Sequence, residues 1–464
     1  MNREMKLIKS LISEISMGPF GSDIKVEFFV DEGIPVLNGS NVGGVKLSEE
    51  SFKYLTKDKA DSLKKANAKR GDIIITHRGT LGQISYIPQD SKQERYVISQ
   101  SQFRVTLKKD LVDPAYFTYY FHTTEGQKRL LSFKNHVGVP ALAQATTNFR
   151  LLEFPWIPLS DQQKIASVLS SLDSKIELNN KINAELEAMA KLIYDYWFVQ
   201  FDFPISAAQA TAMGKPELAG KPYKSSGGPM VYNQTLKREI PEGWEDAILG
   251  DIMTLQRGVT YNKDDIRNKN SKGVTPVLRA TNISGNVIDL NDMVYVPSKL
   301  VSDNQKMATG DILITMSSGS KDHIGKNGMF HFEEEVGFGA FCARIIPKER
   351  YRSFLYSYMQ SEFMNATIKN ECLGTNINNL NGSLVKGFKL ILPDDSTLKR
   401  FEVIVSPFFE KIGINLKQNQ ELRSLRDWLL PMLMNGQVSI KEAEEHPEIY
   451  RESMAADERG DYGK

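Results

Sequence analysis

PVLNGSNVGG occupies residues 35–44, and a close copy of it, PVLRATNISG, returns at residues 276–285. A second pair stands in the same order at almost the same separation, with RGDIIITHRGT at 70–80 and TGDILITMSSG at 309–319. Local composition does not produce matches whose offset stays nearly constant over such a length. They indicate an internal repeat of a whole domain, far longer than a solenoid unit. The sequence therefore predicts two copies of one fold.

Each copy divides into a globular part and a long helix. In the globular part, β-rich runs such as DIIIT, YVIS and FRVTL alternate with Gly, Asn and Ser turns. We therefore predict an α+β fold class, with two repeated globular domains separated by two long antiparallel coiled-coil helices, related by a pseudo-twofold axis. The expected parts are globular domains at 1–158 and 246–395, helices at 159–200 and 396–436, an irregular connector at 201–245 that runs back along the helices, and a mobile charged tail at 437–464.

Both helices carry apolar residues at alternating steps of three and four, which is the spacing of a coiled-coil seam. The first seam is expected to continue through Met189 and Tyr196. Asparagines interrupt the two seams at corresponding places. At a seam, Asn penalises slipped registers; alternatively, these residues face solvent at the border of the stripe. The predicted seam residues are Ile176, Asn179, Asn183 and Leu186 in the first helix, and Ile412, Asn415, Asn419 and Leu422 in the second.

Composition indicates a globular protein, because 41% of the 464 residues are hydrophobic and 25% are charged. The start of the chain is polar and no long apolar run follows, so neither a signal peptide nor a membrane span is expected, and we predict a cytoplasmic location. The 58 basic residues are balanced by 57 acidic ones. A nucleic-acid site would therefore need a local basic surface or one shared with a partner.

Catalytic motifs do not emerge from the sequence. It has no phosphate-binding loop of the Gly-Lys-Ser/Thr type and no Gly-x-Ser-x-Gly nucleophile elbow. A nuclease-like set of Asp72, Asp90 and Lys92 has suitable residue types for a divalent metal, but its counterpart Asp311 is not followed by an acid-x-Lys pattern in the equivalent stretch. We predict neither catalytic nor metal-binding residues.

The loops that recur in both copies are rich in Asn, Ser, Thr, Arg and His, the side chains that read base edges or hold phosphates. These residues are also ordinary in turns. The framework matches between copies while the loop residues often differ, as at Asn38 and Arg279, which favours two related readers of different sequences. The candidate DNA-binding residues are Asn38, Ser40, Asn41, His77, Arg78, Thr80, Lys134, Asn135 and His136 in the first copy, and Arg279, Thr281, Asn282, Ser317, Ser318, Lys321, Thr375, Asn376 and Asn378 in the second.

Several segments resemble the specificity subunit of Type I restriction–modification enzymes. They are GDIIITHRGTLG at 71–82, the long helical segment with its linker at 158–204, GKPYKSSGG at 220–228, REIPEGWE at 238–245 and LRDWLLPMLMNGQV at 425–438. The resemblance spans nearly the whole chain up to the tail. In the second copy SSGSKDH stands where the first has the His-Arg pair, so only the positions of the loops are transferred, and no base assignments.

The resemblance implies a subunit without catalysis of its own. Its two target-recognition domains would each read one half of a bipartite double-stranded DNA sequence, and its helices would set the spacing. It also implies two methyltransferase subunits and two restriction subunits as partners. These partners would use S-adenosylmethionine, ATP and Mg²⁺, and this chain would bind no cofactor. A nuclease or methyltransferase acting alone, or a coiled-coil scaffold without a DNA role, are the alternatives.

Overall fold

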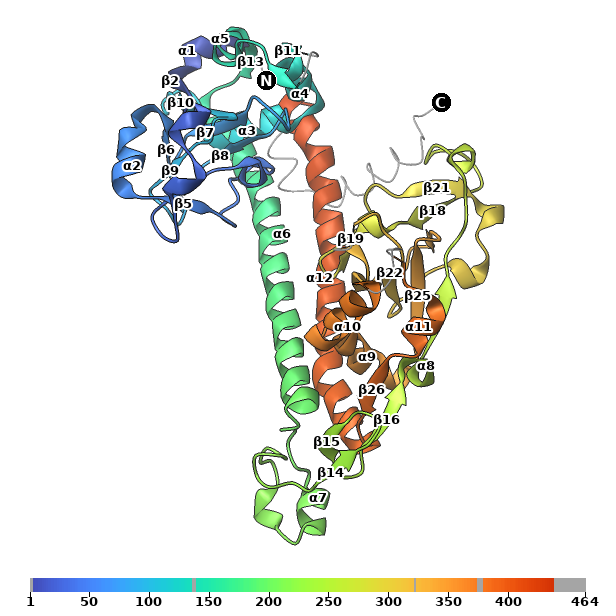
Figure 1. Ribbon diagram of the computed structural model, residues 1–464. Coiled ribbons are helices and arrows are strands. Elements are labelled where there is room, and N and C mark those ends of the chain that lie inside the picture. Colours follow the sequence, from blue (N-terminus) through green and yellow to red (C-terminus); the bar gives the residue numbers. More distant parts are fainter. Residues whose placement is uncertain (1–2, 136–138, 321–322, 374–378, 438–464) are drawn as a thin grey trace. The chain divides into compact units, whose positions relative to one another are not determined.

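The computed structural model describes residues 3–135, 139–320, 323–373 and 379–437 (Figure 1). The chain forms two compact units: one contains the residues up to Ile176 and those from Glu421 onward, and the other contains Glu177–Gln420. The long helices α6 (Leu159–Tyr194) and α12 (Asp395–Asn435) contribute residues to both units. From residue 438 on, the predicted tail lies outside the described residues.

The first unit is built on a four-stranded antiparallel sheet with strand order β2–β10–β7–β8. Its core strand β7 is the IIIT of the repeated segment, and all four of its residues are buried. Short helices cover the sheet, and Phe103, Phe117, Phe149 and Phe154 pack together beneath them. The elements are α1 (Ile8–Leu11), β2 (Ile12–Met17), β7 (Ile73–Thr76), β8 (Ile84–Tyr86), β10 (Gln102–Leu107), α3 (Pro114–His122), α4 (Thr124–Leu131) and α5 (Ala145–Leu151).

A second sheet of the first unit, with order β3–β5–β4–β9–β6, contains the opening decapeptide. PVL enters this sheet through β4 and ends at Leu37, which is fully buried. Two small antiparallel pairs, β1 with β13 and β11 with β12, complete the unit. The elements are β1 (Glu4–Leu7), β3 (Phe29–Val30), β4 (Ile34–Val36), β5 (Lys53–Leu55), α2 (Lys57–Ser62), β6 (Asn67–Lys69), β9 (Arg95–Val97), β11 (Lys134–Asn135), β12 (Ala141–Leu142) and β13 (Glu153–Trp156).

The second unit repeats this plan, with strand order β17–β25–β22–β23 in its main sheet and β21–β18–β24 in a smaller one. In both copies the PVL strand pairs in parallel with the strand that comes just before a central strand of the main sheet. In the first copy β4 pairs with β9, which precedes the central strand β10, and in the second β18 pairs with β24, which precedes the central strand β25. The elements are β16 (Glu245–Ile248), α8 (Leu249–Ile252), β17 (Met253–Arg257), β18 (Val274–Leu278), β19 (Ile283–Ser284), β20 (Val287–Ile288), β21 (Val294–Pro297), β22 (Ile312–Thr315), β23 (Asn327–Met329), β24 (Gly337–Phe338), β25 (Cys342–Pro347), α9 (Arg352–Met359), α10 (Glu362–Leu373), α11 (Gly382–Lys386) and β26 (Lys389–Leu392).

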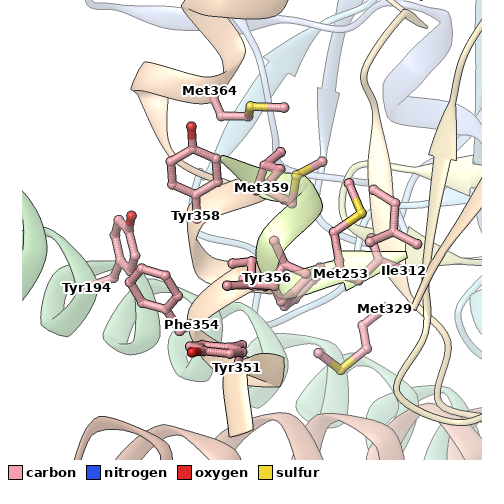
Figure 2. Close-up of a cluster of buried hydrophobic side chains, with 14 of the residues drawn as sticks. Tyr194, Met253, Ile312, Met329, Tyr351, Phe354, Tyr356, Tyr358, Met359 and Met364 are labelled. Atoms are coloured by element: carbon pink, nitrogen blue, oxygen red, sulfur yellow. The ribbon is translucent and has the colours of Figure 1, made fainter. Parts of the chain in front are cut away.

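Helix α9 fills the core of the second unit, between its sheet and the long helices (Figure 2). Phe354 lies against Tyr194 of α6, with ring centroids 5.9 Å apart, and Tyr356 lies against Phe409 of α12 at 5.0 Å. These aromatic contacts bury a large apolar area on both helices. The globular domain and the helical part of this unit therefore share one core.

The repeated Gly-Asp pair forms the same buried turn in both copies. Gly71 and Gly310 have φ angles of +90° and +91°, which favour glycine. The following Asp72 accepts a hydrogen bond from the Lys69 amide and forms an ion pair with Arg104, Nη1 to Oδ2 at 3.7 Å. In the second copy Asp311 accepts from the Ala308 amide and pairs with Arg344, Nε to Oδ2 at 2.5 Å. This turn explains why GD recurs in the sequence.

The two long helices are antiparallel where they share a unit. In the second unit the Asn179 amide donates to Asn419 at 2.9 Å, and four residues further along α6 Asn183 accepts from Asn415 at 2.8 Å. All four side chains are buried, with exposures between 0% and 5%, so they lie in the seam and do not face solvent. In the first unit, Asp173 of α6 binds Arg426 of α12 at 2.7 Å.

The other predicted seam residues are apolar and lie on the inner face. Ile176 and Ile412 are buried, while Leu186 and Leu422 are partly buried. The expected continuation through Met189 and Tyr196 is wrong, because these side chains are 48% and 37% exposed. Near its end α6 buries Ala190 and Tyr194, and the π-helical turn that follows it, η5 (Asp195–Val199), buries Trp197. The core of the second copy thus displaces the simple seam there.

The connector does not run back along the helices as expected. Phe203 stacks between Tyr223 and Trp244, with centroid distances of 4.6 and 5.0 Å, and Trp244 also contacts Phe198 at 5.8 Å. The connector therefore begins and ends at the same place, beside the end of α6. It also contains regular structure, namely α7 (Ala207–Ala212) and a hairpin of β14 (Met230–Asn233) with β15 (Arg238–Pro241). Aromatic stacking, which sequence periodicity does not detect, holds it in place.

Replacing Asn415 by Leu should destabilise the protein by about 1–3 kcal/mol, because the Asn183 oxygen loses its donor in a buried seam. Adding Asn183→Leu should recover part of that loss, since two apolar side chains leave no unpaired amide. Urea unfolding of the four proteins of the double-mutant cycle measures the coupling between the two positions. Strictly additive losses would contradict a paired amide seam.

His331 should make stability depend on pH. Its ring packs against Gly413 of α12, and burial lowers its pKa to about 4, with Lys417 acting in the same direction. Because the unfolded chain binds this proton with an ordinary pKa near 6.5, stability is full above that pH and falls by about 2–3 kcal/mol as the pH drops toward 4. His331→Leu should flatten the curve of unfolding free energy against pH in this window. Identical curves for both proteins would contradict the assignment.

Candidate nucleic-acid interface

In the first unit the predicted loops meet at the end of strand β7. The Leu142 amide donates to the His77 carbonyl at 2.8 Å, and the Gly79 amide donates to the Pro140 carbonyl at 3.0 Å. The loop after β7 therefore lies directly beside the segment that enters β12. Arg78 and Thr80 are exposed on this loop, as are Lys134 and Asn135 on β11, the strand that pairs with β12.

The turn Ser99–Ser101 joins these loops to the loop that follows the PVL strand. We call this loop, Asn38–Asn41, and its counterpart Arg279–Asn282 the PVL loops. The His77 amide donates to the Ser101 carbonyl at 2.9 Å, and the His77 ring contacts the Gln100 carbonyl through Nε2 at 3.1 Å. The Gln102 side chain donates to the Asn38 carbonyl at 3.1 Å. We call the residues Asn38–Asn41, His77–Thr80 and Pro140–Leu142 the first loop cluster.

The second unit joins its loops in a similar way, and two of its backbone bonds correspond to those of the first unit. The Met316 amide donates to the Phe341 carbonyl at 2.8 Å, and the Leu380 amide donates to the Met316 carbonyl at 2.7 Å. The Gly339 amide donates to the carbonyl of Leu278, next to Arg279. We call Arg279–Asn282, Met316–Gly319 and Asn379–Leu380 the second loop cluster. Its exposed or half-buried side chains include those of Arg279, Thr281, Ser317 and Ser318.

Asn41 and Asn282 hold the PVL loops in shape, so their assignment as base-reading residues is wrong. They are 1% and 3% exposed. Asn41 accepts from the Asn38 amide and donates to the carbonyls of Ser48 and Glu50. Asn282 accepts from the Arg279 amide and donates to the carbonyls seven and nine residues later, Asp289 and Asn291. Both amide groups are thus occupied by their own backbone, and a base edge cannot reach them.

The side chains that surround these asparagines are accessible and differ between copies. Asn38 is exposed and caps the short turn η3 (Gly39–Val42) by accepting from the Ser40 amide and hydroxyl. Arg279 is half-buried and donates through Nη2 to the carbonyl and the carboxylate of Asp292. Both positions therefore stay candidates for specific reading, as do Ser40 and Thr281.

His77 is constrained more than its prediction as a DNA contact implied. Its ring is partly buried near Phe103, and burial lowers its pKa below the ordinary value, with Arg78 acting in the same direction. The ring positions the loop through its contact with the Gln100 carbonyl. Five predicted residues lie outside the described residues: His136 of the first copy, and Lys321, Thr375, Asn376 and Asn378 of the second.

The sequence reasoning missed the glutamines that join the loops. Gln102 is fully buried and makes bonds to both Asn38 and the Ser99 amide. Gln100, in the same turn, contacts the His77 ring through its backbone carbonyl. Both stand between the β-rich runs YVIS (96–99) and FRVTL (103–107), and polar side chains between two apolar runs were the available signal.

The nuclease-like set has no geometry for metal chemistry. Asp72 is bound by Arg104, Thr106 and the Lys69 amide, and burial raises its pKa. Within the described ranges, no group of three or more His, Cys, Asp or Glu side chains is placed to hold a metal ion. The helices of those ranges also include none with the length and apolar character that a bilayer crossing requires.

Comparison with known proteins identifies the family to which this repeated framework belongs. The family described as Type I restriction modification DNA specificity domain matches residues 22–188 and 241–424, so each match covers one copy and much of its helix. The chain belongs to this family. Specificity subunits select the DNA target of a Type I enzyme and do not carry its catalysis.

Two relatives show how the similarity is distributed. The Type I restriction enzyme MjaIX specificity subunit of Methanocaldococcus jannaschii is 27% identical over 379 residues, which cover 80% of this chain and 79% of that protein. The EcoKI specificity subunit of Escherichia coli K12 is 38% identical, but only over 143 residues, or 31% of each chain. The crystal structure of the S subunit from M. genitalium has the same fold, with a TM-score of 0.54 at 17% identity, covering 93% of this chain and 96% of that one.

Asn282→Ala should loosen the second PVL loop, because the Asp289 and Asn291 carbonyls and the Arg279 amide lose their partner, at a cost of about 1–3 kcal/mol. Arg279→Ala is the matched control: its side chain is partly exposed, and a change of about 0.5 kcal/mol or less is expected. Hydrogen exchange across residues 279–291 measures the loosening. Equal exchange in the two variants would show that Asn282 does not hold the loop.

Proposed function

We propose that this chain is the DNA-reading subunit of a Type I restriction–modification complex, and that each loop cluster reads one half of a bipartite duplex sequence. The observation that carries the proposal is the pairing of a repeated framework with unlike exposed side chains. Asn41 and Asn282 hold the two PVL loops with the same pattern of hydrogen bonds, while Asn38 and Arg279 present different chemistry from them. Asn suits adenine and Arg suits guanine as bidentate partners, so two such clusters would select two different half-sites.

Phosphate contacts would supply much of the affinity in this proposal. Arg78 of the first loop cluster is exposed, and so is Lys134 on the neighbouring strand β11. The basic stretch 53–70 is divided: Lys53 and Lys59 lie over the rings of Phe29 and Phe28, whereas Lys64 and Lys65 are exposed. With a net charge of only +1, the chain would share the neutralisation of the DNA with its partners.

We also propose that two methyltransferase subunits and two restriction subunits assemble on this chain, and that they bring S-adenosylmethionine, ATP and Mg²⁺. An exposed apolar stripe on the end of α6 and on the following turn η5 supports a protein partner. Met189, Leu192, Tyr196 and Val199 follow one another at helical spacing and are 37–68% exposed. A contiguous apolar stripe of this kind is typical of an interaction surface.

The test is to reconstitute the chain with its methyltransferase partner and to map methylated adenines in a naive genome. One bipartite sequence should be modified, with its two parts separated by a fixed spacer. Arg279→Ala should relax or change the preference in one part, and Arg78→Ala should weaken the other part, because the two residues lie in different loop clusters.

Two results would contradict the proposal. Methylation without sequence preference in the wild-type complex would exclude a reading role for the chain. Equal effects of both variants on both parts of the target would show that the loop clusters do not read separate half-sites. Circular dichroism and co-purification with the partner confirm that each variant remains folded and assembled.

A further inference from the structure

Each loop cluster is bordered by a close backbone contact that only glycine permits. Gly18 follows β2 and lies against the carbonyl of Ser99, where an added Cβ atom would overlap that oxygen. In the second unit, Gly258 follows β17 and lies in the same way against the carbonyl of Gly339. The two contacts correspond in the repeat, because Ser99 and Gly339 both begin the turn that leads into the central strand.

An exposed phenylalanine stands two residues beyond this contact in each unit. In the first unit it is Phe20, two residues after Gly18, with 83% of its surface exposed. In the second unit it is Phe341, two residues after Gly339, with 68% exposed. In the first unit the phenylalanine follows the glycine of the contact, and in the second unit it follows the residue whose carbonyl that glycine touches. Each loop cluster therefore has one such phenylalanine beside it.

The corresponding positions without a phenylalanine carry small hydroxyl side chains. Thr260 stands two residues after Gly258, and Ser101 stands two residues after Ser99. The duplication has therefore kept one exposed phenylalanine beside each loop cluster although the chain position that supplies it has changed. A requirement of the surface explains this exchange better than a requirement of the fold, since neither ring belongs to a core.

Both rings are exposed on a backbone that is held in place. The Phe20 amide donates to Asp23 Oδ2 at 3.0 Å, and its carbonyl accepts from the Asp23 amide at 2.9 Å. The neighbouring Gly21 packs against the side chain of Gln100, whose carbonyl contacts His77. The Phe341 carbonyl accepts from the amides of Met316 and Ser317, at 2.8 and 3.2 Å. Little backbone entropy would be lost when either ring binds a ligand.

We propose that Phe20 and Phe341 are the aromatic base contacts of this chain, one for each half-site, where each ring packs against bases of the bound duplex. A large, rigid apolar ring left in water gains from burial against a base. Aromatic rings pack on bases, and apolar side chains can enter a base step that has opened. The inference rests on the proposed DNA-reading function and adds to it the residues that supply apolar contact beside the polar readers.

The experiment uses the full complex of this chain with its methyltransferase subunits and the mapped target duplex. Phe20→Ala should weaken equilibrium binding about ten- to a hundredfold. Base-pair changes in one half-site should then cost less affinity than they do with the wild type, while changes in the other half-site cost the same. Phe341→Ala should produce the opposite pattern, and a Trp at either position should restore most of the affinity.

Leu151→Ala and Tyr232→Ala are matched controls, because these side chains are 56% and 57% exposed outside the loop clusters. They should leave the discrimination in both half-sites unchanged. Unchanged affinity and discrimination in both phenylalanine variants would overturn the inference, and so would equal losses in both half-sites. If the wild-type complex itself shows no preference for its mapped target, the proposed function fails, which is a separate result.

Discussion

The buried asparagine pairs of the long helices set a constraint on which much of the second unit depends. Asn179 meets Asn419, and Asn183 meets Asn415, in a seam otherwise lined by apolar residues. A slip along this seam would leave several buried amides unpaired, each at a cost of about 1–3 kcal/mol. Because α12 begins three residues after β26 and is capped at Asp394, which also binds Trp244, its register is coupled to the globular domain. The asparagine pairs make the seam less stable than an apolar one, but they fix the register of α12 and with it the position at which the globular domain packs on the helices.

The duplication separates the residues that build the fold from those that differ between the copies at the surface of the loops. The repeated bonds are made by buried groups: the Asp–Arg pair behind the central strand, the asparagine that shapes the PVL loop and the glycine that allows close contact between backbones. The unlike residues, Asn38 against Arg279 and Arg78 against Ser317, lie at the surface of the same loops. A duplicated scaffold of this kind can hold different chemistry at equivalent points, which suits a protein that distinguishes two sequences.

The duplication, the fold class and the long helices could be predicted because a constant offset and a helical period are properties of the sequence itself. The errors have a common physical origin in tertiary packing. Asn41 is a typical turn residue in the sequence, and only the fold shows that its amide is saturated by Ser48 and Glu50. Met189 fits the seam period, but aromatic packing by Tyr194 and Trp197 selects another face. Phe20 was missed because most phenylalanines lie in a core, so exposure is visible only in the structure.

The position of the unlike residues also explains how such a surface can change without loss of the fold. Substitutions at exposed loop positions usually alter stability by about 0.5 kcal/mol or less, whereas each buried bond of the framework contributes more. Specificity can therefore vary where folding imposes little constraint. The exchange between Phe20 and Phe341 illustrates this, since the ring moved from one strand to the other while the glycine contact beneath it stayed in place. The framework determines where a side chain is presented, and in the proposed function the exposed residue would determine which base is recognised.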